Sequence, residues 1–226
     1  MPEGAISAGR ESRSWMIVLF RPITEGHLSD VPGMLSPVTL RGPQVRLEPL
    51  TMEHVDALSS VGLDGAIWEY TPRVVRTTQD MQEYVSEALD GQRRGHMLPF
   101  AIVIQETGVV AGSTRFGNID LTNRRMEIGW TWLAPAWQRT GVNREAKYLL
   151  LTQAFEEWGC IRVEFKTDVL NSRSRRALLG IGAVEEGVLR RHVVVAGGRV
   201  RDTVYHSILD TEWPAVKVRL EAGLVR

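Results

Sequence analysis

The sequence has 226 residues, of which 43% are hydrophobic and 24% are charged, and its 27 basic and 27 acidic side chains cancel to a formal net charge of zero. This length and composition are typical of one globular domain with a sizeable core. A balanced charge provides no general attraction to nucleic acid or to an anionic membrane surface, so neither partner is expected.

Cysteine content and apolar runs limit the class further. Cys160 is the single cysteine, which excludes an intramolecular disulfide and a thiolate zinc cluster, and we expect it to be a small buried residue. No run approaches the roughly 18 apolar residues of a membrane helix. The apolar patch at residues 15–20 is shorter than a signal-peptide core. We therefore expect a cytoplasmic protein without a metal site.

The N-terminal stretch, residues 1–37, differs from the rest of the chain. It is rich in Gly, Ser and Pro and has no sustained periodicity. We expect an appendage that is disordered or packs on the domain. Residues 38–226 have regular patterns throughout and are expected to form a single domain.

The first half of this domain begins with a strand. Residues 38–50 alternate around Gly42-Pro43, which predicts a strand with an edge irregularity. Thr51 is expected to cap a helix over residues 52–62, and Thr78 to cap a second helix that ends near Gly91. A loop that contains residues 68–72 joins the two helices.

The second half predicts a mixed sheet. Residues 98–105, 109–119 and 124–135 read as an antiparallel meander. A helical period then runs over residues 142–158, and a strand over 161–169 should lie parallel to the strand before this helix. A short helix capped by Asn171, a hairpin with its turn at residues 196–199, and a terminal helix from about residue 211 follow. The order predicts a mixed α/β fold.

The most informative motif lies before the long helix and reads Gln138-Arg139-Thr140-Gly141-Val142-Asn143. A helix start has unpaired N–H groups and a positive dipole, so a close-fitting turn at Gly141 is typical of a diphosphate site. Arg139 adds a charge. No Gly-Lys-Ser/Thr follows, and the spacing is not Gly-x-Gly-x-x-Gly, so the common nucleotide-binding loops are excluded.

The order of these elements and motifs resembles the GNAT acyltransferase family, in particular its RimJ/RimL-like branch, over roughly residues 38–220. The family's diphosphate pattern has Gly or Ala where Asn143 stands. Further matches are the segments 127–130, 171–174 and 182–187. The resemblance implies a GNAT-like fold, in which a mostly antiparallel sheet contains one parallel strand pair that splays apart to admit acetyl-CoA.

The resemblance also implies the residues that bind the cofactor. Asn171 would hold the pantetheine arm, or serve as a plain N-cap, and Ser174 would lie near the sulfur, or bond within its own helix. Arg176, in a basic run, would contact the adenine-side phosphate or remain solvated. The backbone residues implied along the arm are Trp132, Leu133 and Ala134. The diphosphate residues implied are Gln138, Arg139, Thr140, Gly141, Val142 and Asn143.

Acetyl transfer to an amine needs a base, because most amines are protonated at pH 7. Strand alternation places Glu127 on the face opposite Met126, Ile128, Trp130 and Trp132, with both tryptophans expected in the core. Glu127 is therefore the preferred base. The alternative is that Glu127 is a solvated strand carboxylate without a catalytic role. No Cys or Ser nucleophile motif is present, so direct attack in a ternary complex is expected.

Acceptor contacts are expected from two regions. The family resemblance assigns the acceptor pocket to the loop near the first two helices, with Glu69 as a second candidate base and Trp68 and Tyr70 as its lining. It places the final hairpin, with His192 and Tyr205, at the border of the same pocket. Exposed apolar residues 193–195 of this hairpin make a homodimer reasonable.

Together these features predict an N-acetyltransferase that uses acetyl-CoA and acts on a primary amine. Two aromatic side chains in the acceptor loop favour a small-molecule acceptor. The alternatives are the N-terminus of a protein or peptide, as for RimJ and RimL, and a catalytically silent acyl-CoA-binding module.

Overall fold

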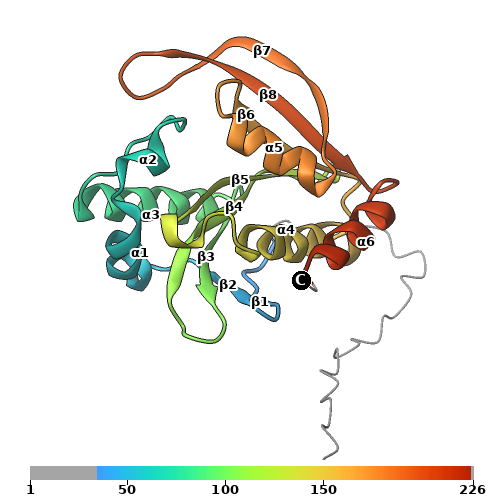
Figure 1. The fold of residues 1–226 in the computed structure, drawn as a ribbon, viewed down its shortest axis with the longest axis horizontal. Helices are drawn as coiled ribbons and strands as arrows, with labels where there is room; N and C mark the ends of the chain where they lie inside the picture. The colour runs from blue at the N-terminus through green and yellow to red at the C-terminus, as the bar shows by residue number, and fades with distance from the viewer. Residues whose placement is uncertain (1–34, 225–226) are drawn as a thin grey trace, which may run out of the picture. The chain divides into compact units, whose positions relative to one another are not determined.

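The computed structural model describes residues 35–224, which form an eight-stranded sheet flanked by six α-helices (Figure 1). Most of the predicted appendage, residues 1–37, lies outside the described residues. Among the helices of the described part, none is long and apolar enough to cross a membrane.

The helices and strands occur in nearly the predicted order. The strands are β1 (Leu40–Arg41), β2 (Val45–Pro49), β3 (Leu98–Ile104), β4 (Val110–Asp120), β5 (Arg125–Leu133), β6 (Arg162–Asp168), β7 (Val184–Val194) and β8 (Val200–Leu209). The helices are α1 (Val55–Gly62), α2 (Gly65–Trp68), α3 (Thr78–Arg93), α4 (Val142–Thr152), α5 (Ser172–Ile181) and α6 (Trp213–Leu224). Short 3-10 turns cover Met52–His54 and Pro135–Trp137, and a π-turn, Gln153–Glu157, extends α4.

The sheet has the strand order β1-β2-β3-β4-β5-β6-β8-β7, and β5 and β6 are the parallel pair within it. This pair is joined at three positions, where residues 125–127 lie opposite residues 162–164. Beyond them β5 runs on to Leu133 and β6 to Asp168 without pairing to each other. We call this unpaired region the splay. The expected mixed fold with a diverging parallel pair is confirmed.

Helices cover both faces of the central strands. Adjacent strand residues point to opposite faces. On β4, Arg115 donates a hydrogen bond to the backbone carbonyl of Tyr84 on α3. Its neighbour Thr114 bonds to Thr131, which accepts a hydrogen bond from Lys147 on α4. The sheet therefore has an α3 face and an α4 face. All seven residues of β3 are buried, which explains its continuous apolar run.

The first predicted strand is instead a hairpin. Gly42 donates its N–H to the carbonyl of Val45 at 2.8 Å, so the chain turns at Gly42-Pro43 and β1 pairs with β2. Glu145 of α4 anchors this turn, because its Oε1 accepts the N–H groups of Gln44 and Val45. Burial raises the pKa of Glu145. The local pattern of alternation does not distinguish one irregular strand from two short ones.

A bulge in β5 changes which side chains share a face. Arg115 lies opposite Gly129 and Ser113 opposite Trp132, so two β5 residues face one β4 residue. At the bulge Trp130 has a φ of +50° and is 38% exposed. Trp132 is buried, as expected, but shares the α3 face with Glu127. The prediction of a core position for Trp130 is wrong because the bulge interrupts the alternation.

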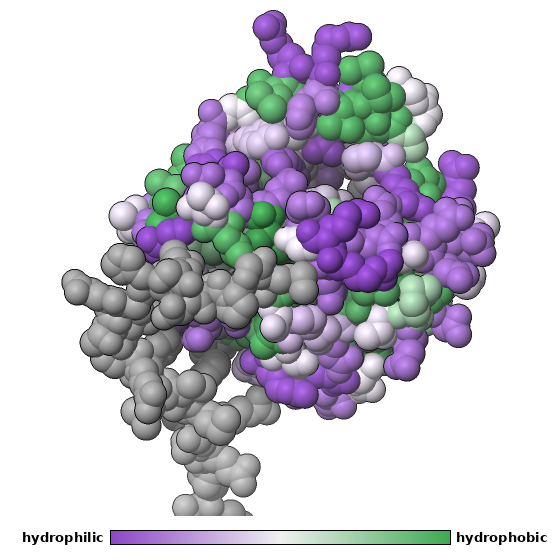
Figure 2. Space-filling model, turned by 180° about the vertical axis from the view of Figure 1, so that it is seen from behind, coloured by the Kyte–Doolittle hydropathy of each residue, from purple (hydrophilic) through white to green (hydrophobic). Residues whose placement is uncertain are grey.

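The β7–β8 hairpin lies at the top of Figure 1, beside β6. Seen from behind, hydrophobic side chains gather at this end of the molecule among hydrophilic ones (Figure 2). The exposed apolar residues of the hairpin include Val188, Leu189 and Val194, the last being 65% exposed, whereas Val195 is buried. The apolar surface on which the homodimer expectation rests is therefore present but does not include Val195.

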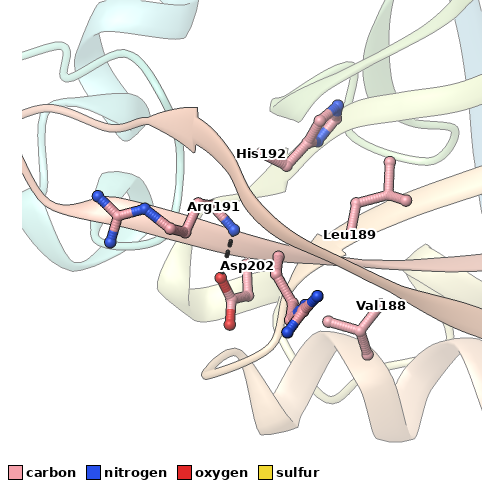
Figure 3. A pocket seen from close by; sticks show the side chains of 6 residues that line it. Val188, Leu189, Arg191, His192 and Asp202 are labelled. Carbon is pink, nitrogen blue, oxygen red and sulfur yellow. Dashed lines mark hydrogen bonds between the residues drawn. The ribbon is translucent and has the colours of Figure 1, made fainter.

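The outer strand β7 also has a bulge. Leu189 pairs with Thr203 and Val193 with Arg201, so three β7 residues face Asp202 alone. The Arg191 N–H donates to the Asp202 carboxylate at 2.6 Å (Figure 3). An open hollow at this bulge lies on β7 and β8, away from the splay. Bulges of this kind interrupt the pairing edge of an outer strand.

Candidate active site

The turn before α4 presents, in the described part of the chain, a group of unbonded backbone N–H groups at a helix start. Gly141 is the N-cap of α4, and Arg139 has a φ of +60°. Within residues 35–224, the N–H groups of residues 139–141, 143 and 144 have no protein acceptor. A Cβ at Gly141 would lie 3.0 Å from Oε1 of Gln44, so the site has little room for a side chain. Free N–H groups at the start of a helix fit a diphosphate.

Gln138 connects this turn to the strand before it and to α5. Its Nε2 donates to the carbonyl of Leu133 at 2.9 Å, and its Oε1 accepts from Nη1 of Arg173 at 2.7 Å. Arg176, one turn further along α5, is exposed and has no partner among the described residues. The basic residue that contacts the turn is therefore Arg173.

The end of β5 directs one of its three predicted backbone residues into the splay. Ala134 donates its N–H to the carbonyl of Ala111 at 2.8 Å, so it faces β4. Because backbone groups alternate between the two edges of a strand, Trp132 also faces β4 and Leu133 faces the splay. The carbonyl of Leu133 is already bonded to Gln138, so the N–H of Leu133 is the group directed into the splay.

Asn171 caps the start of α5, as one of its two predicted roles requires. Its Oδ1 accepts the N–H of Ser174 at 2.9 Å, which makes it the N-cap of α5. Its oxygen is thus occupied, and its amide NH2 group has no partner within the described residues. The hydroxyl of half-buried Ser174 is likewise without a partner among residues 35–224.

Glu127 lies where β5 and β6 part, on the α3 face. Its buried carboxylate accepts through Oε2 from Nδ2 of Asn118 at 2.6 Å and from Nζ of Lys166 at 2.7 Å. Burial alone would lower the pKa of Lys166, but the hydrogen bond and charge of Glu127 outweigh burial and raise it. A Cβ at Gly129 would lie 2.8 Å from Oε1 of Glu127, so the glycine keeps space open beside this oxygen.

Two further predicted residues lie next to this ion pair. The Nζ of Lys166 is 5.0 Å from the ring centroid of Tyr205, and the Tyr205 ring is 5.9 Å from that of His192. Side chains of β5, β6, β8 and β7 thus form a continuous row, which we call the polar row: Glu127, Lys166, Tyr205 and His192. His206 follows Tyr205 in β8 and therefore points to the opposite face, where burial lowers its pKa.

Helix α2 ends at Trp68, and the predicted acceptor residues Glu69 and Tyr70 follow directly after it. Trp68 is 2% exposed, donates from Nε1 to the carbonyl of Gly62 at 2.7 Å, and packs against Tyr84 and Trp132. It therefore belongs to the core and does not line a pocket, because α2 turns its ring inward. Glu69 is exposed, and its hydrogen bond raises the pKa of the half-buried Tyr70.

Lys147 is a buried titratable residue near the splay that the sequence patterns did not single out. It lies on α4, is 5% exposed, and donates from Nζ to Oγ1 of Thr131 at 2.6 Å. Burial lowers the pKa of Lys147 to about 7, and the charge of Glu127 opposes part of this effect. A usable signal existed, since Lys147 shares the apolar side of the helix with Leu150 and Ala154, at spacings of three and seven.

Residues 44–184 match the sequence profile described as "Acetyltransferase (GNAT) domain". The chain belongs to the GNAT family of acetyl-CoA-dependent N-acetyltransferases. The crystal structure of a GCN5-related N-acetyltransferase from Brucella melitensis superposes with a TM-score of 0.77 over 84% of this chain and 86% of that one, and the two sequences are 33% identical.

Two relatives agree with the RimJ/RimL-like branch of the GNAT family. YdaF of Bacillus subtilis, named as a ribosomal N-acetyltransferase, is 37% identical over 110 residues, which are 49% of this chain and 59% of YdaF. The alignment thus spans about three fifths of that relative. RimJ of Mycobacterium smegmatis, solved in complex with CoA-disulfide, is 28% identical, with a TM-score of 0.70 over 83% of this chain and 93% of RimJ.

Proposed function

We propose that this GNAT protein acetylates the N-terminal amine of a protein or peptide, by direct attack of the amine on acetyl-CoA within a ternary complex. Relatives named for ribosomal proteins support this acceptor class. The small-molecule expectation depended on an aromatic pocket formed by Trp68 and Tyr70, and Trp68 is in the core. The main ground for a small acceptor is therefore gone.

The observation that carries the proposal is the polar surface beside Glu127. On the α3 face, strand pairing aligns polar side chains over β6 and β8, of which Lys166 and Tyr205 are partly exposed, whereas Glu164, Asp168, Thr203 and Ser207 are buried. The accessible groups continue from Lys166 and Tyr205 to the exposed His192 on β7. A line of hydrogen-bonding groups across three strands suits a peptide chain, which offers an amide at every residue. A compact apolar pocket would suit a small amine better.

Each candidate residue has a role that its contacts support. The N–H groups at the start of α4 would hold the diphosphate, and the Leu133 N–H and the Asn171 amide would hold the pantetheine arm. Bound acetyl-CoA supplies the activated acetyl thioester. Glu127 would accept a proton from the incoming ammonium through Oε1, directly or through one water. The Ser174 hydroxyl would donate to the departing thiolate.

The test of the base is Glu127→Gln, with Glu164→Gln as its matched control. Both glutamates lie on the α3 face and pair across the same rung of β5 and β6, but Glu164 is bonded to Arg125 and Arg162. We expect the Glu127 variant to lose roughly 10²- to 10⁴-fold in kcat, with an unchanged Kd for acetyl-CoA. Equal and small effects of both variants would contradict the assignment.

The acceptor class is tested by steady-state rates on three sets of amines. These are short peptides with a free N-terminus, the same peptides with a blocked N-terminus, and small amines such as free amino acids and polyamines. We expect the highest kcat/KM for free peptides and no turnover of blocked ones. A higher kcat/KM for small amines would refute the peptide proposal without affecting the family assignment.

A further inference from the structure

The sequence has three lysines among its 27 basic residues, and they differ in their partners. Lys166 is bonded to Glu127 at 2.7 Å, and Lys217 to Glu156 at 2.8 Å. Lys147 is the most buried of the three, yet within residues 35–224 it has no carboxylate partner. Burial of an ammonium without a direct ion pair is unfavourable, and the more distant charge of Glu127 offsets only part of this cost, so this position calls for a reason other than stability.

The contacts of Lys147 leave part of its hydrogen-bonding capacity unused. An ammonium has three donors, and one of them bonds to Oγ1 of Thr131, which in turn lies 2.7 Å from Oγ1 of Thr114. The other two donors have no acceptor in the described part of the chain. Thr131 lies on the stretch of β5 from which β6 has diverged, so the ammonium lies over the strand that borders the splay.

The position of Thr131 along β5 indicates which part of a coenzyme would lie there. Leu133, at the diphosphate end, is two residues away, and Glu127, at the reacting end, is four residues away. At about 3.3 Å per residue, these separations are roughly 7 and 13 Å. A coenzyme that extends from the α4 turn to Glu127 would therefore pass Lys147 with the middle of its pantetheine arm.

We propose that Lys147 is a coenzyme-binding residue whose ammonium donates a hydrogen bond to an amide carbonyl of the pantetheine arm. The side chain is held in place by Thr131 and shielded from water by α4. A lysine suits a narrow buried position, because its ammonium is compact, whereas arginine presents a broad planar group. The inference depends on the family's use of acetyl-CoA and is independent of the acceptor.

The experiment is calorimetric titration of Lys147→Met with acetyl-CoA and with free CoA. The arm is common to both ligands, so we expect an equal loss of affinity, roughly 10- to 100-fold, as for one charge-assisted hydrogen bond. Lys217→Met is the matched control, because it removes a lysine on α6 that is paired with Glu156. The control should bind both ligands as the wild type does.

A second readout separates ligand binding from a structural role. The Tm of the ligand-free Lys147→Met protein should rise, because the variant removes a buried charge that has no counter-ion. An unchanged Kd for both ligands would overturn the proposal, whatever the Tm. A loss confined to acetyl-CoA would overturn the assignment to the arm, since the contact would then be with the acetyl group. Lys147→Gln, which keeps an N–H donor, should show a smaller loss and provides the test if the Met variant does not fold.

Discussion

The buried ammonium of Lys147 makes the stability of the ligand-free protein depend on pH in a defined window. In the folded protein its pKa is lowered to about 7, whereas in the unfolded chain it is about 10.4. Between these values unfolding takes up a proton, because the unfolded chain is protonated and the folded protein is not. The free energy of unfolding contributed by Lys147 therefore rises with pH from about 7 upward, and the unfavourable burial of the charge is greatest below pH 7.

The magnitude follows from the same values. The slope is at most about 1.4 kcal/mol per pH unit, so between pH 7.5 and 9 the contribution of Lys147 improves by about 2 kcal/mol. For a protein of this size, this corresponds to a Tm change of about 4–8 °C. Lys147→Met lacks the titrating group, so its stability advantage over the wild type should shrink by that amount across the interval.

The assay is urea unfolding of both proteins, followed by far-UV circular dichroism at several pH values between 6 and 9. Other groups with shifted pKa values, such as His206 and Cys160, titrate in both proteins, and their effects cancel in the difference. A difference in unfolding free energy that stays constant between pH 7 and 9 would refute the argument. It would mean that Lys147 is hydrated or finds an anionic partner.

Three further perturbations test the site and the hairpin. Gly141→Asp should weaken acetyl-CoA binding at least about 100-fold by calorimetry, because its carboxylate repels the diphosphate and its Cβ would meet Gln44 at 3.0 Å; micromolar binding by the folded variant would contradict the diphosphate site. Trp68→Ala should lower the free energy of unfolding by about 3–5 kcal/mol. Tyr70→Ala should change the free energy of unfolding by less than about 1 kcal/mol and raise the KM for the acceptor. A larger loss of stability for Tyr70→Ala than for Trp68→Ala in denaturant titrations would argue against the core position of Trp68. If the apolar surface of the hairpin joins two copies, sedimentation velocity should show a dimer that Val194→Glu converts to monomer, and a monomeric wild type would reject the dimer.

Local patterns predicted most of the secondary structure. The apolar run of β3, the helical period of α4 with its end at Gly159, and the hairpin of β7 and β8 depend on residues close together in the chain. The parallel pairing of β5 and β6 was also predictable, because a helical crossover returns the chain in the same direction. Errors of one or two residues at the ends, as at Thr77 rather than Thr78 for the cap of α3, are usual.

Periodicity gave the wrong prediction where the pairing of neighbouring strands outweighed it. The bulge at Trp130 and the turn at Gly42-Pro43 depend on how neighbouring strands pair, and the pattern of a single strand does not contain that information. The short helix α2 was expected as a loop, and its formation turns Trp68 into the core. The acceptor class inferred from that loop changed with it.

The sequence by itself determined the family, the order of the elements and the Gly141 turn before α4, because these depend on contiguous residues and on helix-terminal groups that any such turn presents. Only the tertiary structure decided the surroundings of isolated side chains. It joined Glu127 to Lys166, Tyr205 and His192 across four strands, and it buried Lys147 beside the splay without a counter-ion. Charge, burial and hydrogen bonding in these places come from residues distant in the chain, and one-dimensional periodicity contains no information about such contacts.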